Sequence, residues 1–241
     1  MAESYRQSTP AGEPSGADLS ARVFQGYQVR TRRYSFGRRA IELLAPVNPA
    51  ALLDDPRVMA RFAHDEHMPY WAEVWPASLL LAHELAAWPT APAGAGRVLE
   101  LGCGLGLVAL LAMDRGYDVI ASDYDADALA FVAENARRNG VRCPALRQID
   151  WRCAYPDLRP ACILAADVLY ERRNVAPIAD FLARHMPPAG VAHVADTHRP
   201  TADAFPAAAA ERGLRVITRP VEYAAAPGSA PVRGRLFEVR R

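Results

Sequence analysis

Between a short apolar strand and an apolar helix the chain reads Glu100-Leu101-Gly102-Cys103-Gly104-Leu105-Gly106. Residues 98–101 are typical of a buried strand, and residues 106–115 predict a helix. A strand followed by a glycine-rich turn and a helix is the place where open α/β sheets bind nucleotide-like ligands. The stretch therefore predicts an α/β fold with a ligand site at the turn.

Strands and helices alternate from this turn towards the C-terminus. The alternation favours right-handed crossovers and a parallel sheet with helices on both faces. The last two strand-like segments, 214–223 and 232–240, are joined by a loop of Pro, Gly and Ala and predict an antiparallel hairpin. The other expected strands are 117–121, 145–149, 161–166 and 191–195, and the other expected helices are 125–139, 175–185 and 201–212.

A second hairpin is expected near the N-terminus. Residues 27–33 and 40–44 are rich in β-forming residues, and Ser35-Phe36-Gly37 reads as the turn between them. A helix is then expected from Asn48-Pro49 towards Phe62.

An aromatic segment bounded by proline precedes the glycine turn. It reads Pro69-Tyr70-Trp71-Ala72-Glu73-Val74-Trp75-Pro76 and leads into an apolar helix expected at 77–88. Residues 1–20 predict a disordered tail because they offer little apolar surface. We expect residues 21–241 to form a single domain.

Two details of the turn narrow the choice of ligand. The dinucleotide-binding fingerprint requires glycine at GxGxxG spacing, but the last of these positions is occupied by Leu107. Glu100 stands directly before the turn, where a carboxylate repels a pyrophosphate. A carboxylate there suits S-adenosylmethionine, which carries an ammonium and a sulfonium group and no phosphate. The alternative is a Glu100 that only faces solvent.

The next two strands end in acidic residues. Asp123 is placed to accept both ribose hydroxyls of such a ligand, and Asp150 to accept the adenine amino group. Tyr124 and Trp151 follow these acids and would pack beside the adenosine. The alternatives are a helix N-cap for Asp123, a role that Asp125 fills equally well, and a core aromatic for Trp151.

Together these motifs resemble the class I, or seven-β-strand, S-adenosylmethionine-dependent methyltransferases. More narrowly, they resemble the lysine methyltransferase group called family sixteen. In that group a Trp-containing segment precedes a helix ahead of the glycine motif, as residues 70–76 do here. An Asp-x-x-Tyr motif follows the fourth strand, as Asp167-Val168-Leu169-Tyr170 does. The helix end from Glu134-Asn135 to Asn139 also matches.

The resemblance implies a Rossmann-like, doubly wound sheet of seven strands, mostly parallel with an antiparallel final strand, next to the N-terminal β-hairpin. Asp167 and Tyr170 would lie at the substrate mouth as the catalytic residues, and no metal is expected. The residues expected at the cofactor site are Trp75, Glu100, Gly102, Gly104, Gly106, Asp123, Tyr124, Asp150 and Trp151.

The resemblance further implies a protein lysine N-methyltransferase, similar to bacterial relatives of the electron-transfer flavoprotein β-subunit lysine methyltransferase. Those relatives usually carry Asp-x-Phe-Tyr, whereas this chain has Leu169 in place of Phe, which leaves the acceptor open. The alternatives are a small-molecule N- or O-methyltransferase, as in relatives labelled nicotinamide N-methylases, and an adenosine-binding module without activity. As a hypothesis, Asp167 holds the neutral amine by a hydrogen bond, and Tyr170 with Trp71 or Trp75 forms an aromatic wall.

Three further motifs are candidates for substrate binding, metal binding and nucleophilic catalysis. Asp196-Thr197-His198-Arg199 ends the fifth strand at the ligand edge of the sheet, where it either contributes to substrate binding or caps the next helix. His64-Asp65-Glu66-His67 lacks HExxH spacing and a third ligand, so it reads as a solvated helix end rather than a metal site. Cys103 has no His partner placed by the sequence and is expected to be a small filler.

Composition excludes several function classes. All 28 basic residues are arginine, so chemistry that needs a lysine, such as a Schiff base, is excluded. The net charge of +1 gives no reason to expect nucleic acid as a partner. The four cysteines form no CxxC pair, and no apolar segment resembles a signal core or a membrane span. We expect a cytoplasmic monomer that acts on a protein or on a small molecule.

Overall fold

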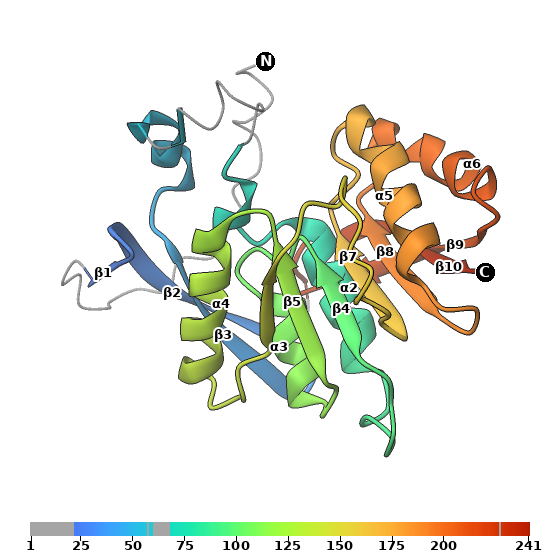
Figure 1. Cartoon of the computed structure of the whole chain (residues 1–241). Helices are drawn as coiled ribbons and strands as arrows, with labels where there is room; N and C mark the ends of the chain where they lie inside the picture. The colour runs from blue at the N-terminus through green and yellow to red at the C-terminus, as the bar shows by residue number, and fades with distance from the viewer. Residues whose placement is uncertain (1–21, 57, 60–67, 227) are drawn as a thin grey trace.

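The computed structural model describes residues 22–56, 58–59, 68–226 and 228–241 (Figure 1). The predicted tail at 1–20 and the motif from His64 to His67 lie outside the described residues. Among the described residues, no helix has both the length and the apolar character needed to cross a bilayer.

A sheet of seven strands forms the centre of the molecule, in the order β6-β5-β4-β7-β8-β10-β9. Neighbouring strands from β6 to β8 run parallel, whereas β10 runs antiparallel to both β8 and β9. The predicted doubly wound sheet with an antiparallel final strand is thereby confirmed. The strands are β4 (Val98–Leu101), β5 (Val119–Asp123), β6 (Ala145–Gln148), β7 (Cys162–Ala166), β8 (Val191–Asp196), β9 (Arg215–Tyr223) and β10 (Val232–Arg240).

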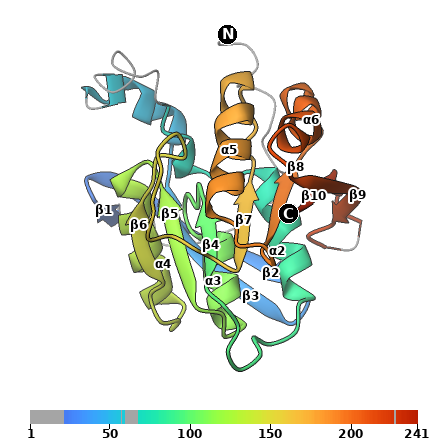
Figure 2. The same ribbon diagram turned by 45° about the vertical axis from the view of Figure 1, so that its right-hand side comes forward.

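Helices cover both faces of this sheet, because alternate side chains of each strand enter different cores. Along β7, Cys162 and Leu164 pack in the core under α2, α3 and α4, whereas Ile163 and Ala165 pack in the core under α5 and α6. Figure 2 shows α5 and α6 together, apart from α4. The α-helices are α2 (Pro76–Ala86), α3 (Leu107–Asp114), α4 (Ala126–Arg138), α5 (Arg172–His185) and α6 (Phe205–Ala210). The 3-10 helices in the described part of the chain are η2 (Pro49–Asp54), η3 (Tyr70–Ala72) and η4 (Pro200–Ala204).

The N-terminal hairpin is part of a separate antiparallel sheet, in the order β1-β2-β3. Its strands are β1 (Arg22–Phe24), β2 (Tyr27–Phe36) and β3 (Arg39–Pro46). The strands run further than expected: Ser35 and Phe36 belong to β2, and the turn falls at residues 37–38. Phe36 is buried against the ring of Tyr223, which explains why the strand continues through it.

Two helix predictions need correction. The helix expected from Asn48 begins as the 3-10 helix η2, and the segment towards Phe62 lies partly outside the described residues. The helix expected at 201–212 is divided into η4 and the short α6, each with a proline in its first turn. Proline suits a first turn because the missing N–H has no intrahelical partner there.

The parallel strands bring their carboxyl ends to one edge of the sheet, since each pairs in register with its neighbour. Leu101, Asp123, Gln148, Ala166 and Asp196 end the five parallel strands. The loops that follow these residues therefore converge, and this edge is where open α/β sheets bind ligands.

Candidate functional site

A cavity of about 770 Å³ lies at this edge. Segments far apart in the sequence line it: η3, the glycine turn, the ends of β5 to β7, and the loop after β8. The predicted site residues that line it are Trp75, Glu100, Gly102, Gly104, Asp123, Tyr124, Asp150, Trp151, Asp167 and Tyr170.

The three glycines of the turn all have left-handed backbone, with φ of 65° at Gly102, 51° at Gly104 and 86° at Gly106. A β-carbon on Gly104 would lie 3.2 Å from the carbonyl oxygen of Trp71. Gly106 differs from the prediction, because it is not among the residues that line the cavity. A β-carbon there would lie 2.9 Å from Val132 on α4, so Gly106 allows two helices to pack closely.

Glu100 carries a buried carboxylate at the cavity wall, with the residue only 2% exposed. Among the described residues, its Oε2 has no hydrogen-bond partner. Burial raises the pKa of this carboxyl well above its ordinary value, and the nearby Asp123 raises it further. A buried acceptor without a partner is costly, so the arrangement fits a ligand that brings a donor such as an ammonium group.

Asp123 shapes the turn while it lines the cavity. Its Oδ2 accepts a hydrogen bond from the Gly104 N–H at 2.8 Å, and its Oδ1 accepts one from the Asp125 N–H at 3.0 Å. The N-cap of α4 is Asp125, whose side chain accepts from the Asp127 N–H. Asp123 is therefore not the helix cap, and a carboxylate has about four lone-pair sites, enough to accept from a ligand as well.

The adenine end of the predicted site is held by an ion pair. Asp150 accepts from the Arg152 guanidinium, with an Nε–Oδ1 distance of 2.8 Å, and Arg152 lies over the ring of Tyr124 at 5.6 Å. Trp151 is half-buried, packs against the core and also borders the cavity, so its packing beside an adenosine stays a prediction.

Asp167 also lines the cavity, in left-handed backbone with φ of 58°. Its side chain is buried and makes two parallel hydrogen bonds with Arg199, Nε to Oδ1 at 2.5 Å and Nη2 to Oδ2 at 2.9 Å. The carboxylate is thus paired with a guanidinium, and the hypothesis that Asp167 also holds an incoming amine by a hydrogen bond stays a prediction.

Arg199 ends the motif at residues 196–199 for which the sequence left substrate binding and helix capping as alternatives. It lines the cavity, and its guanidinium lies 5.7 Å from the Trp75 ring centre. Its backbone N–H donates to Asp196, which in turn pairs with Arg235. The hydrogen bond with Asp167 raises the pKa of Arg199 above its ordinary value. Of the two interpretations of residues 196–199, substrate binding is the one that this placement favours.

Aromatic rings line the wall next to Asp167. Tyr70 contacts the Tyr170 ring at 5.0 Å and the Trp75 ring at 5.7 Å, so it joins the two residues that were expected to form the wall. The Trp71 ring packs on Tyr27 and Phe131 instead. Burial raises the pKa of the Tyr170 hydroxyl, so the phenol stays protonated at neutral pH. Tyr70 had no expected role at the site from the sequence, and its place in the aromatic segment at residues 69–76 was the only feature that pointed to it.

Two other chemistries lack support in the structure. Cys103 is buried, and burial raises the pKa of its thiol well above the ordinary value, so it stays protonated and is no nucleophile. The described residues contain no group of three or more His, Cys, Asp or Glu residues arranged to hold a metal ion.

Solved structures with this fold include several methyltransferases. The 16S rRNA N2 G1207 methyltransferase of T. thermophilus, in complex with AdoMet and guanosine, aligns with a TM-score of 0.58 and 18% identity over 88% of this chain and 51% of its own. The mitomycin 7-O-methyltransferase MmcR aligns with a TM-score of 0.56 and 20% identity, over 80% of this chain and 60% of its own. The glycopeptide N-methyltransferase MtfA, complexed with sinefungin, aligns with a TM-score of 0.51 and 18% identity, over 67% of this chain and 92% of its own. Identities this low show a common fold alone.

Similarity of the sequence, rather than of the fold, shows the protein family. No curated protein shows significant similarity to this chain. The family model described as "Methyltransferase domain" matches residues 58–223, which is more than half of the chain. The chain therefore belongs to the methyltransferase domain family and is an S-adenosylmethionine-dependent methyltransferase, the class of enzyme that the glycine turn predicted.

Proposed function

We propose that this methyltransferase transfers the methyl group of S-adenosylmethionine to an amine, and that the amine is a lysine side chain of a protein substrate. The observation that carries the proposal is the character of the cavity. Its lining includes a buried carboxylate with one oxygen that has no hydrogen-bond partner among the described residues, and it also combines carboxylates with three aromatic rings.

The methyl donor is S-adenosylmethionine, and the residues fit it. Glu100 and Asp123 offer carboxylate oxygens to an amine and to ribose hydroxyls, and Asp150 with Trp151 offers an acceptor and a ring to adenine. The Glu100 carboxylate directly before the glycine turn opposes the binding of a pyrophosphate. When bound, this cofactor supplies an electrophilic methyl group on a sulfonium.

The charge of the cavity lining favours a cationic acceptor. Six carboxylate residues border the cavity against three arginines, and each of those arginines has a carboxylate partner: Arg152 with Asp150, Arg173 with Glu171, and Arg199 with Asp167. The excess of negative charge attracts an ammonium and repels phosphate. The faces of Tyr70, Tyr170 and Trp75 attract a cation in the same way.

Methyl transfer requires the amine in its neutral form, because the ammonium has no lone pair. The paired Arg199 holds the Asp167 carboxylate in one orientation, and this carboxylate keeps lone pairs with which to accept a hydrogen bond from an amine N–H. The rings of Tyr70 and Tyr170 exclude water from the same place. Because no covalent intermediate on the protein is needed, the residues act by positioning and desolvation.

The test is to incubate the enzyme with S-adenosylmethionine labelled in the methyl group and a cell lysate, divided into protein, nucleic-acid and small-molecule fractions. We expect label in the protein fraction, and N-methyl-lysine after hydrolysis of that fraction. Label confined to nucleic acid would overturn the proposal of an amine acceptor on a protein. Label confined to small molecules would replace the lysine by the second candidate.

The second candidate is a small-molecule N- or O-methyltransferase. The observation that favours it is Arg199 inside the cavity, since an arginine guanidinium binds carboxylates in a two-pronged geometry. A small acceptor that carries a carboxylate would compete with Asp167 for this group. A labelled small product whose formation is lost in Arg199→Met would support this candidate.

A further inference from the structure

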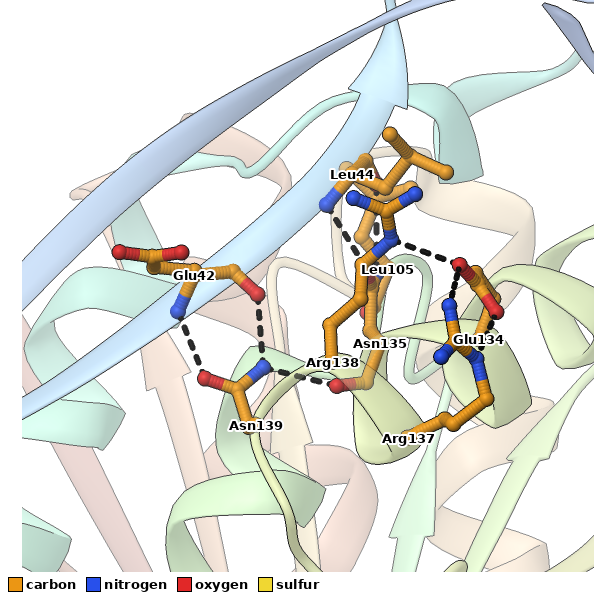
Figure 3. Close-up of polar contacts among 8 residues, drawn as sticks. All are labelled: Glu42, Leu44, Leu105, Glu134, Asn135, Arg137, Arg138 and Asn139. Carbon is orange, nitrogen blue, oxygen red and sulfur yellow. Dashed lines mark hydrogen bonds and ion pairs between the residues drawn. The ribbon is translucent and has the colours of Figure 1, made fainter.

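Asn135 on α4 and Asn139, the residue at the C-cap of this helix, face the edge of β3 that does not pair with β2. Figure 3 shows Asn135 and Asn139 on the helix side that faces this strand, whereas Glu134 points away and pairs with Arg137 and Arg138. Asn135 is fully buried. Buried amides of this kind are rare unless each polar atom has a partner.

Each asparagine makes the pair of hydrogen bonds that a neighbouring strand would make. The Leu44 N–H donates to Asn135 Oδ1 at 2.7 Å, and Asn135 Nδ2 donates to the Leu44 carbonyl at 3.2 Å. The Glu42 N–H donates to Asn139 Oδ1 at 2.9 Å, and Asn139 Nδ2 donates to the Glu42 carbonyl at 2.7 Å. The two amides therefore complete the edge of the N-terminal sheet.

The spacing explains why this works. Four residues along an α-helix advance about 6 Å, and two residues along a strand advance about 6.7 Å. Asn135 and Asn139 are four residues apart, and Glu42 and Leu44 are two residues apart. Side chains at these positions of α4 thus meet successive backbone groups on one edge of β3.

The two asparagines differ in their third hydrogen bond. Asn139 Nδ2 donates to the Asn135 carbonyl within the helix, at 2.7 Å. Asn135 Nδ2 donates to the carbonyl of Leu105 at 3.0 Å, and Leu105 lies between the last two glycines of the turn. Among the described residues, Asn135 therefore bonds to both the N-terminal sheet and the glycine turn, whereas the side chain of Asn139 bonds to the sheet and to its own helix.

We propose that Asn135 is a positioning residue for the methyl-donor site, which fixes the glycine turn against the edge of the N-terminal sheet. The turn is then held from two sides: Asp123 accepts from the Gly104 N–H, and Asn135 donates to the Leu105 carbonyl. Left-handed glycines have wide conformational freedom, so the turn needs such restraints to keep one shape. This inference rests on the proposed binding of S-adenosylmethionine at the turn.

The first test compares Asn135→Ala with its matched control Asn139→Ala, which loses the same kind of contact to β3 but none to the turn. Calorimetric titration with S-adenosylhomocysteine, at a temperature where thermal melts show both variants folded, is expected to give at least tenfold weaker binding for Asn135→Ala. Binding to Asn139→Ala should stay within twofold of the unmodified protein. Equal affinities for the two variants would overturn the inference, and an unmodified protein that binds no S-adenosylhomocysteine would instead overturn the proposed cofactor.

A second test uses the unmodified protein, so it does not depend on how a variant folds. Hydrogen exchange is followed at the amides of Leu44 and Glu42, which donate to Asn135 and Asn139 respectively. If the turn and the strand are joined through Asn135, saturating S-adenosylhomocysteine slows exchange at Leu44 several-fold more than at Glu42. An equal effect at the two amides, or none at either, would count against a positioning role.

Discussion

At the scale of single residues, burial and ion pairing determine the charge of the groups that build the site. Asp167 and Arg199 pair with each other beside the cavity, whereas Oε2 of Glu100 has no hydrogen-bond partner among the described residues. We propose that the first pair serves the methyl acceptor and that Glu100 serves the methyl donor. Each of the two carboxylates offers a substitution that changes one property of the site.

Asp167→Asn removes the charge of this carboxylate and keeps its shape. Asparagine tolerates left-handed backbone, so the variant should fold even though φ is 58° at this position. We expect kcat/KM for methyl transfer to fall by about 10²-fold or more, the size of effect typical when a reacting group is no longer held in position. Calorimetry should show S-adenosylhomocysteine binding within twofold of the unmodified protein. Turnover equal to that of the unmodified protein would exclude Asp167 from the reaction.

Glu100→Gln removes the negative charge that we propose pairs with the ammonium group of the methyl donor. We expect S-adenosylhomocysteine to bind about tenfold more weakly, which corresponds to about 1.4 kcal/mol. As a control, Asp157→Asn alters an exposed carboxylate away from the cavity and should leave binding unchanged. An undiminished affinity in Glu100→Gln would remove this residue from the cofactor site.

The same variant has a predicted pH dependence without ligand. Burial raises the pKa of Glu100 in the folded protein, so the folded state holds its proton at a pH where the unfolded state has lost it. The contribution of Glu100 to stability is therefore present below its ordinary pKa and declines as the pH rises above it. Urea unfolding should show that Glu100→Gln gains stability relative to the unmodified protein as the pH is raised from 4 to 7. A constant difference would mean that the carboxyl is not desolvated.

At the scale of elements, hydrophobic alternation and local capping chemistry predicted most of the secondary structure. The strand at 98–101 was predicted to the residue, and the N-cap alternative at Asp125 was confirmed by its hydrogen bond to Asp127. These features depend on neighbours within a few residues. The continuation of β2 through Phe36 depends on Tyr223, a residue far along the chain, and so it left no local signal.

The same distinction holds for the candidate site. The residues expected at the methyl-donor site follow the ends of successive strands, so a sequence pattern can find them. The pairing of Asp167 with Arg199 joins the loops after β7 and β8, and depends on the register of those strands. Gly106 was predicted at the site because it belongs to the glycine turn, yet its contact is with α4.

Gly106→Ala tests the packing of α3 on α4. The added methyl group meets Val132, and the residue must keep left-handed backbone with φ of 86°. Strained backbone of this kind costs about 1–3 kcal/mol, so we expect the free energy of unfolding in urea to fall by about that amount. Gly228→Ala is the control, because φ there is also left-handed, at 83°, but a β-carbon meets no atom within 4 Å. If the two variants lost equal stability, the contact with Val132 would contribute nothing.

At the scale of the whole molecule, the cavity is assembled from parts that are distant along the chain. Trp71 and Tyr70 precede the glycine turn, whereas Arg199 follows β8, and the N-terminal sheet supports the turn through Asn135. A single domain over residues 21–241, a cytoplasmic location and a monomeric state remain predictions. The assembly does imply that a ligand in the cavity stabilises both sheets together.

Ligand-induced stabilisation therefore gives a prediction about the whole chain. A ligand present at 100 times its Kd raises the free energy of unfolding by about 2.7 kcal/mol, which raises Tm by about 5–10 °C in a chain of this size. We expect this shift with S-adenosylhomocysteine in a thermal melt. NAD at the same concentration should give none, because Glu100 opposes its pyrophosphate and Leu107 occupies the position of the third fingerprint glycine. Equal shifts with the two ligands would show that the Glu100 carboxylate does not select against phosphate, and the assignment of the cofactor from Glu100 would fail.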